Sequence, residues 1–496
     1  MRTVLVANRG EIAVRVVRAC REAGLRTVAV YSDADRGAPH VLAADQAIAV
    51  GPPPARESYL NIEALLGAAR TAGADAVHPG YGFLAESAAF AEAVEAAGLV
   101  WIGPPPQAIA TMGDKLAARA TVARAGVPLV PGTELVAADV ATARRQIAAL
   151  GYPVLVKAAG GGGGKGMRTV AGEEELGPAL AAASREAESA FGDRRVYVEK
   201  LLRRPRHVEV QVLGDRHGHL IHLGERECSI QRRHQKIVEE TPCPALTPRL
   251  RAEMTAAALA AARAVGYTNA GTVEFLLDAD GRFYFLEMNT RVQVEHPVTE
   301  LVTGIDIVAA QLRIAAGETL GFGQSDVVPR GHAIEVRLYA EDPAHNFFPS
   351  PGPILAWREP SGPGVRVDSG VVAGTVVPVD YDPMLAKISV WAADRATAVR
   401  RLRVALEGTV VLGPTTNLGF LLDILAHPAF LAGDTHTGFL TEHLADWRAA
   451  GPDATAAAIA AAIALSRPAA PSAGGERAAA PTPWETLGAW RLGAQH

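Results

Sequence analysis

Five consecutive glycines, Gly160–Gly164, follow an apolar run at positions 154–156, with lysines at 157 and 165. A glycine run leaves backbone amides open to an anion, and neighbouring cations favour phosphate. The P-loop pattern does not fit, because it needs glycine where the chain has Ala159 and Ser or Thr where it has Gly166. We predict a phosphate-binding loop of another kind, with a flexible surface hairpin as the alternative.

Two glutamates lie on either side of a predicted hairpin. The apolar runs 271–277 and 282–286 are separated by Asp-Ala-Asp-Gly, a turn sequence. If Leu277 pairs with Arg282, Glu287 lies on the same side as Glu274, one step further along, on a diagonal of ~7–8 Å. Two carboxylates at that distance could share one or two metal ions.

The residues after this hairpin alternate in polarity, with apolar Met288, Val292 and Val294 between polar neighbours. In an extended strand the polar members share one face; they are Glu287, Asn289, Arg291, Gln293 and Glu295. Carboxylate and amide oxygens suit Mg²⁺, which usually also binds substrate phosphates, and a guanidinium suits an oxyanion such as bicarbonate or a carboxylate. The alternative is a solvated edge strand, which the apolar opposite face makes less favourable.

Residues 225–236 are dense in hydrogen-bond donors that could meet a triphosphate and a small anion. Taken alone, this segment is more typical of a solvated face, and Cys228 within it is expected to pack as a small buried residue. His207 by itself is more typical of a structural histidine. His78 opens the segment 78–82 after a predicted strand, which indicates either a ligand-binding strand end or a tight structural turn.

The elements that must position these residues begin with a βαβα rhythm over residues 3–103, which predicts a parallel sheet covered by helices. The turn after the first strand, residues 8–11, has one glycine where a dinucleotide site needs three, so we expect no NAD site. Residues 154–202 predict a compact subdomain with strands on both sides of a helix at 177–190. Strands then follow over 208–294, interrupted by a long helix at 248–265. Two later helices are predicted at 395–406 and 416–426.

Length and composition indicate a globular protein of several domains. The 496 residues correspond to about three domains, and 49% hydrophobic with 20% charged residues is typical of a globular protein. A net charge of −5 excludes an overall nucleic-acid footprint. Three scattered cysteines fit a reducing, cytoplasmic setting. We find no signal peptide, and the apolar stretch 454–465 is well short of the ~20 residues that span a bilayer, so no membrane association is expected.

Taken together, the motifs resemble biotin carboxylase, the ATP-grasp component of biotin-dependent carboxylases, from position 4 to about 444. The segments that carry the resemblance are 7–13, 78–84, 112–115, the glycine loop, 231–236 and 287–297. The resemblance implies an α/β and α+β fold in three domains followed by a tail. These are an N-terminal Rossmann-like parallel-sheet domain at 1–113, an ATP-grasp domain at 114–329 with a mobile glycine-loop lid at about 130–202, a mixed α/β C-terminal domain at 330–446, and an Ala/Pro-rich tail at 447–496.

The resemblance also implies roles for individual residues. The positions that hold ATP in the family correspond to Lys115, Lys157, Gly163, Gly164, Glu199, Lys200, Leu201, Leu202, His207, Gln231, His234, Glu274 and Glu287. The ligands of Mg²⁺ or Mn²⁺ correspond to Glu274, Glu287 and Asn289. The bicarbonate pocket corresponds to Lys236, Arg291, Gln293, Val294 and Glu295. Arg337 matches the arginine that meets the biotin ureido oxygen, and Tyr81 matches an aromatic residue near the biotin ring.

The implied reaction runs through carboxyphosphate, with Arg291, Glu295, Lys236 and Arg337 as the catalytic residues. Glu295 would deprotonate bicarbonate, which attacks the γ-phosphorus of ATP. The carboxyphosphate would break down to CO₂ and phosphate, the phosphate would take the N1′ proton of biotin, and Arg337 would stabilise the enolate. The lid would close over ATP and keep water from the intermediate.

The partners are also implied by the resemblance. None of the methionines lies in an Ala-Met-Lys-Met biotin-attachment motif, so biotin is expected on a separate carrier protein or domain, with a carboxyltransferase subunit as a further partner and a homodimer as the assembly. Segments 435–440 and 483–492 look like the junction found in acyl-CoA carboxylase α-subunits, so we expect either a truncated α-subunit or a free-standing carboxylase. The competing interpretations are another ATP-grasp ligase, for example of the carbamoyl-phosphate type, and a catalytically silent nucleotide-binding scaffold.

Overall fold

The computed structural model describes residues 1–133, 140–160 and 167–449. The glycine loop after Gly160 and the predicted tail after residue 449 therefore lie outside the described residues. The described part begins with a five-stranded parallel sheet of order β3-β2-β1-β4-β5. This confirms the predicted parallel sheet, and the edge strand β3 is an addition to the prediction. The strands are β1 (Thr3–Val6), β2 (Arg26–Ser32), β3 (Gln46–Gly51), β4 (Ala76–His78) and β5 (Val100–Trp101).

Helices cover this sheet because their apolar residues recur on one side. In α1, Ile12, Val16 and Cys20 are fully buried, as the helical spacing requires. The helices of this region are α1 (Gly10–Glu22), α2 (Pro39–Ala43), α3 (Ile62–Ala72), α4 (Ala88–Ala96), α5 (Pro106–Gly113) and α6 (Lys115–Arg124).

A separate three-stranded antiparallel sheet of order β7-β6-β8 follows. Its strands are β6 (Val154–Ala158), β7 (Arg168–Val170) and β8 (Val196–Lys200), and its helices are α7 (Val140–Ala148) and α8 (Glu173–Phe191). Val154, Val156, Leu176 and Val198 form a hydrophobic cluster confined to this unit. The predicted compact subdomain is therefore present, with a core of its own.

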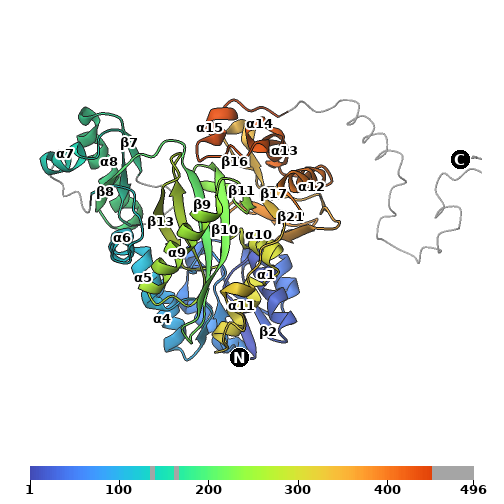
Figure 1. Ribbon diagram of the computed structural model, residues 1–496. Helices are drawn as coiled ribbons and strands as arrows, with labels where there is room; N and C mark the ends of the chain where they lie inside the picture. The colour runs from blue at the N-terminus through green and yellow to red at the C-terminus, as the bar shows by residue number, and fades with distance from the viewer. Residues whose placement is uncertain (134–139, 161–166, 450–496) are drawn as a thin grey trace, which may run out of the picture. The chain divides into compact units, whose positions relative to one another are not determined.

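The central feature is an eight-stranded antiparallel sheet of order β13-β12-β9-β10-β11-β14-β21-β19. Its colours in Figure 1 run from the green of β9 and β10 to the orange of β21, so strands distant in sequence share one sheet. In chain order the strands are β9 (Arg206–Gly214), β10 (Leu220–Arg232), β11 (Gln235–Thr241), β12 (Asn269–Leu277), β13 (Phe283–Asn289), β14 (His332–Tyr339), β19 (Val365–Ser369) and β21 (Met384–Ala392).

The remaining elements pack around this sheet or lie at its C-terminal end. The helices are α9 (Pro248–Ala264), α10 (His296–Thr303), α11 (Ile307–Ala315), α12 (Arg395–Glu407), α13 (Leu418–Ala426), α14 (Pro428–Leu431) and α15 (Phe439–His443). The short strands are β15 (Glu341–Asp342), β16 (Phe348–Pro349), β17 (Gly352–Pro353), β18 (Ala356–Arg358), β20 (Val376–Val377) and β22 (Val410–Leu412). In the described part of the chain, no helix combines the length and apolar character that crossing a membrane requires.

The predicted hairpin exists, but its predicted register is wrong. Leu277 pairs with Phe283 rather than Arg282, and a bulge between Glu274 and Phe275 then places Glu274 directly opposite Glu287. A bulge sets two residues of one strand against one of the other and re-aims the side chains beyond it. The two carboxylates are therefore direct cross-strand neighbours instead of diagonal ones.

Candidate active site

A cavity of about 780 Å³ lies between the β6–β8 unit and the eight-stranded sheet. Most of the predicted site residues line it, although they come from eight different strands, the start of α6 and the loops between them. They are Lys115, Lys157, Glu199, Lys200, Leu201, Leu202, His207, Gln231, His234, Lys236, Glu274, Glu287, Asn289, Arg291, Gln293, Val294 and Arg337. Gly163 and Gly164 lie outside the described residues.

The two facing carboxylates form one side of the cavity. Asn289 Nδ2 donates to Glu274 Oε1 at 2.7 Å, and Gln293 Nε2 donates to the same oxygen at 3.2 Å. Within the described residues nothing hydrogen-bonds to the Glu287 carboxylate, and burial, reinforced by Glu274, raises its pKa. This set of hard oxygen donors fits Mg²⁺ or Mn²⁺, since a divalent cation would relieve the repulsion between the two carboxylates.

Lys236 is the centre of the charged network. Its Nζ lies 2.5 Å from Glu209 Oε2, 2.7 Å from Glu274 Oε1 and 2.7 Å from Glu295 Oε1. Burial alone would lower the pKa of Lys236, but the three carboxylates outweigh burial and raise it well above the usual value. Lys236 is therefore a fixed positive charge that points into the cavity between potential metal ligands and a potential base.

Glu295 lies behind the cavity wall and is fully buried. Its Oε1 contacts Lys236, and its Oε2 accepts from Arg337 Nη2 at 2.9 Å. Arg337 is held in turn by Glu239, whose Oε1 accepts from Nε at 2.6 Å. Burial would raise the pKa of Glu295, but Lys236 and Arg337 hold it well below its usual range. The group is a carboxylate clamped between two cations.

Arg291 organises the anion-binding corner. Its guanidinium donates to Gln293 Oε1 at 2.9 Å, to Asn289 Oδ1 at 3.0 Å and to Glu86 Oε2 at 3.0 Å. Lys236 and Arg291 thus give this corner two cations, a geometry suited to a small oxyanion.

The opposite part of the cavity carries two further lysines. Lys157 Nζ lies 2.9 Å from Glu199 Oε2, while Arg119 contacts the other carboxylate oxygen of Glu199. The Lys115 side chain has no hydrogen-bond or ion-pair partner within the described residues, and burial lowers its pKa despite the opposing field of Glu287. An unpartnered lysine on the cavity wall indicates a site for an anion such as a phosphate.

Gln231 and Lys200 complete this part of the cavity. Gln231 Nε2 lies 2.6 Å from His207 Nδ1, and His207 Nε2 lies 2.8 Å from Glu274 Oε2. Lys200 Nζ donates to the carbonyls of Gly151 and Tyr152, so its charge is used within the β6–β8 unit. His207 therefore connects the side chain of Gln231 to the metal-ligand side of the cavity, which its isolated position in the sequence did not indicate.

Two expectations are corrected by this geometry. The solvated face expected for residues 225–236 is wrong, because β10 and β11 are largely buried in the middle of the sheet. The extended strand expected up to Glu295 is also wrong: β13 ends at Asn289, and the residues that follow turn into α10. The turn still delivers Gln293 and Glu295 to the site. His78 is buried and accepts from Gly80 N at 3.0 Å, as expected of a residue within a tight turn.

Glu295 and Tyr81 are the described members of the predicted set that do not line the cavity. Tyr81 donates its hydroxyl hydrogen to Glu11, a buried carboxylate of α1. Sequence reasoning missed Glu209 and Glu239, which hold Lys236 and Arg337. A signal existed for Glu209, because it lies two residues after His207 in β9 and therefore on the same face.

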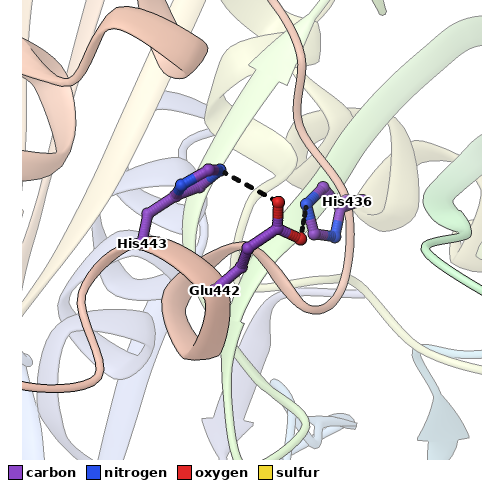
Figure 2. A group of neighbouring side chains, drawn as sticks. All are labelled: His436, Glu442 and His443. Carbon is purple, nitrogen blue, oxygen red and sulfur yellow. Dashed lines mark ion pairs between the residues drawn. The ribbon is translucent and has the colours of Figure 1, made fainter.

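A second group of potential metal ligands lies outside the cavity, at α15 (Figure 2). His436 Nε2 is 3.3 Å from Glu442 Oε2, and His443 Nε2 is 3.9 Å from Glu442 Oε1. The backbone N–H of Gly438 donates to His436 Nδ1 at 3.2 Å, so the neutral ring carries its proton on Nε2. To bind a metal, Nε2 would have to lose this proton and offer its lone pair. A ligating histidine normally donates a hydrogen bond from its other nitrogen, but Nδ1 is an acceptor here. We therefore interpret this group as a cluster of polar side-chain contacts rather than a metal site.

Three consecutive parts of the chain match models of known protein families. Residues 1–109 match the biotin carboxylase N-terminal domain, residues 114–322 match the ATP-binding domain of the carbamoyl-phosphate synthase L chain, and residues 335–442 match the biotin carboxylase C-terminal domain.

Curated relatives cover nearly all of the described part. The chain is 51% identical to the biotin carboxylase of Nostoc sp. over 439 residues, which are 88% of this chain and 98% of that protein. It is 52% identical to the mitochondrial methylcrotonoyl-CoA carboxylase subunit alpha of Oryza sativa over 445 residues, 89% of this chain and 60% of that one.

Solved structures show the same fold. A biotin carboxylase complexed with β-γ-ATP from Campylobacter jejuni has a TM-score of 0.87 at 44% identity and covers 89% of this chain and 99% of its own. The biotin carboxylase domain dimer of the 2-oxoglutarate carboxylase of Hydrogenobacter thermophilus, solved with MgADP and bicarbonate, has a TM-score of 0.87 at 47% identity and covers 91% and 99%. The chain therefore belongs to the biotin carboxylase family of ATP-dependent ligases, and biotin carboxylation in a biotin-dependent carboxylase is its activity.

Proposed function

We propose that this cavity binds ATP and bicarbonate together and that the residues around Glu295 carry out both chemical steps of biotin carboxylation. The observation that carries the proposal is Glu295 clamped between Lys236 and Arg337. Both cations line the cavity, whose opposite part holds Lys115 and Lys157. The solved relatives bind MgADP, bicarbonate or an ATP form, which supports the same ligands here.

In the first step, Arg291, Gln293 and Lys236 hold bicarbonate, and Glu295 accepts its proton. The bicarbonate oxygen attacks the γ-phosphorus, the bond to the β-phosphate oxygen breaks, and ADP leaves as carboxyphosphate forms. Lys115 and Lys157 position the phosphates. Glu274, Glu287 and Asn289 would hold Mg²⁺ or Mn²⁺, which when bound neutralises phosphate charge in a reaction that depends on positioning and electrostatics.

Glu295 becomes an effective base only when its two cationic neighbours interact with the substrates. A carboxylate clamped by two cations is a weak base, as its lowered pKa shows. Lys236 interacts with bicarbonate once it is bound, and Arg337 interacts with the biotin ureido oxygen. Both cations then interact less strongly with Glu295, so the pKa of Glu295 rises and it becomes a stronger base. Base strength is thus coupled to the presence of both substrates.

In the second step, carboxyphosphate breaks down to CO₂ and phosphate, phosphate removes the N1′ proton of biotin, and the N1′ nitrogen attacks CO₂. Arg337 stabilises the enolate oxygen of the ureido ring, and Tyr81 lies beside the ring. The β6–β8 unit, about residues 130–202, closes over the nucleotide and keeps water from carboxyphosphate. Its separate sheet and core support motion as a unit.

The remaining proposals concern assembly. Biotin arrives on a carrier protein or domain, a carboxyltransferase subunit uses the product, the protein is a cytoplasmic homodimer, and the domain limits are those expected above, at 113, 329 and 446. The dimer of the Hydrogenobacter biotin carboxylase domain supports the homodimer, and three free buried cysteines support a reducing compartment. Light scattering of the purified protein tests the dimer.

The decisive experiment measures bicarbonate-dependent ADP release with and without free biotin. We expect biotin to stimulate release, and Glu295→Gln to reduce it by about 10²–10⁴-fold, the usual contribution of a general base. No activity with either Mg²⁺ or Mn²⁺ would overturn the function. Full activity of Glu295→Gln and Arg337→Ala would overturn only these residue roles, and ammonia replacing biotin as the stimulating nucleophile would favour a carbamoyl-phosphate type of ligase.

A further inference from the structure

Lys387 is a fully buried lysine that does not line the cavity. It lies on β21, where it pairs in register with Arg337 of β14 on one side and with Asp368 of β19 on the other. Side chains at directly paired positions of a sheet point to the same face. Lys387 therefore extends from the sheet alongside the arginine that clamps Glu295.

The Lys387 ammonium donates to a backbone carbonyl of the catalytic turn. Nζ lies 2.8 Å from the carbonyl oxygen of Val294, the residue directly before Glu295. Neighbouring strands thus hold two consecutive residues of this turn: β14 holds the Glu295 side chain through Arg337, and β21 holds the Val294 main chain through Lys387. Because β13 ends at Asn289, no strand pairing fixes this turn, so the two side chains replace it.

The same ammonium faces a second functional contact. Nζ lies 3.2 Å from Glu11 Oε2, while the other oxygen of Glu11 accepts from the Tyr81 hydroxyl. A second carboxylate, Asp368, is 3.7 Å away and also pairs with Arg366 at 2.8 Å. Glu11 has no other cation at ion-pair distance among the described residues, so Lys387 alone offsets its buried charge.

We propose that Lys387 is a positioning residue that holds the Val294 carbonyl and the Glu11–Tyr81 pair, and so sets the place of the base and of the biotin-side tyrosine at once. The proposal rests on the roles proposed above for Glu295 and Tyr81. Burying an ammonium is costly even when it is paired, and this one lies at a point where three separate segments meet: α1, β21 and the turn before α10.

The test compares Lys387→Met with a matched control variant and with a double variant. Lys387→Met is expected to lower kcat for bicarbonate-dependent ADP release by about 10–100-fold, the usual effect of a misplacement near 1 Å, and to raise KM for free biotin. The Kd for MgADP should stay unchanged, since no nucleotide contact is altered. Arg395→Met is the matched control: Arg395 pairs with buried Glu240 at 2.7 Å in the same region but away from the cavity, so it should lower the Tm and leave both kinetic constants in place.

A double variant separates positioning from simple charge compensation. Glu11→Gln with Lys387→Met removes both buried charges and should restore the Tm, while kcat stays low because the Val294 carbonyl remains unheld. Recovery of kcat in the double variant, or unchanged kinetics in Lys387→Met, would overturn the inference. Glu295→Gln is measured in parallel: if it keeps full activity, the proposed role of Glu295 fails, whatever Lys387→Met shows.

Discussion

Glu239 and Glu335 are two fully buried carboxyls that face each other across β11 and β14. Each has one carboxylate oxygen with no hydrogen-bond partner within the described residues. Burial raises the pKa of Glu239 to about 7 even though Arg337 opposes the shift, and burial raises the pKa of Glu335 to about 8 with Lys387 opposing and Glu239 adding to it. The folded protein therefore retains protons here that the unfolded chain has released.

This proton retention predicts a loss of stability as pH rises. Both pKa values are raised on folding, so the contribution is fully present below the unfolded value near 4.5 and is lost as pH rises through about 7–8. Glu335→Gln mimics the protonated state. We expect its Tm to exceed that of the parent at about pH 8.5, and by clearly more than at about pH 5.5.

The measurement is thermal unfolding at both pH values, with Glu407→Gln as control. Glu407 is exposed at the end of α12, so its substitution should shift the Tm equally little at either pH. A Glu335→Gln variant whose Tm difference from the parent is independent of pH would contradict the interpretation that the folded protein retains a proton on Glu335.

The environment of Glu287 predicts how its removal changes the concentration of divalent metal that the enzyme needs. Because its carboxylate is unpartnered beside Glu274, Glu287→Gln removes a ligand without breaking any contact in the described part of the chain. The Mn²⁺ concentration for half-maximal ADP release should rise by at least about tenfold, since even indirect ligand supports are worth that much. Glu92→Gln on the exposed side of α4 is the control, and an unchanged Mn²⁺ requirement in Glu287→Gln would exclude the residue as a ligand.

At the scale of elements, α6 places Lys115 at its first position. Asp114 caps the helix, with Oδ1 accepting from Leu116 N at 2.9 Å and Ala117 N at 3.0 Å. Asp114→Ala should cost about 1 kcal/mol of unfolding free energy, the usual value of an N-cap, and raise KM for ATP because the start of the helix frays around Lys115.

Thr247→Ala offers a control of equal cost. Thr247 caps α9 by accepting from Leu250 N at 3.2 Å, and this helix does not line the cavity. Denaturant unfolding should show similar losses for both variants, while KM for ATP rises only in Asp114→Ala. Equal KM values would show that the cap does not position Lys115.

Elements whose pattern is local could be predicted from the sequence, and contacts that depend on sheet order could not. The parallel sheet over residues 3–103 and the helix starting at Pro248 match prediction because short apolar runs, helical spacing and an N-terminal proline mark them. The hairpin register failed because nothing in the alternation of residues 271–286 marks the bulge after Glu274. The pairs Lys236–Glu209 and Arg337–Glu239 join strands whose adjacency no local pattern reveals.

At the scale of the whole molecule, the catalytic network crosses what the family models divide. Residues 114–322 and 335–442 match separate models, yet β11 pairs directly with β14 from Val238↔Val336 to Thr241↔Ala333 in one continuous sheet. The N-terminal region joins them through a hydrophobic cluster that includes Val16 of α1, Leu213 of β9 and Ala270 of β12. The β6–β8 unit has a sheet and a core of its own, and the buried hydrophobic cluster of that core includes no described residue from the rest of the chain.

This arrangement predicts cooperative unfolding of everything except the β6–β8 unit. Splitting the sheet between β11 and β14 would expose a paired edge and break the Arg337–Glu239 contact at 2.6 Å, so the two halves should melt together. MgADP binds only the folded state and should raise the Tm of the single main calorimetric transition progressively with its concentration. Hydrogen exchange should then slow in β14 and β21 as well as in β9 and β10, because all four strands open in the same event. Two main transitions of which MgADP shifts only one, with exchange in β21 unaffected, would show instead that the sheet is energetically divided at β14.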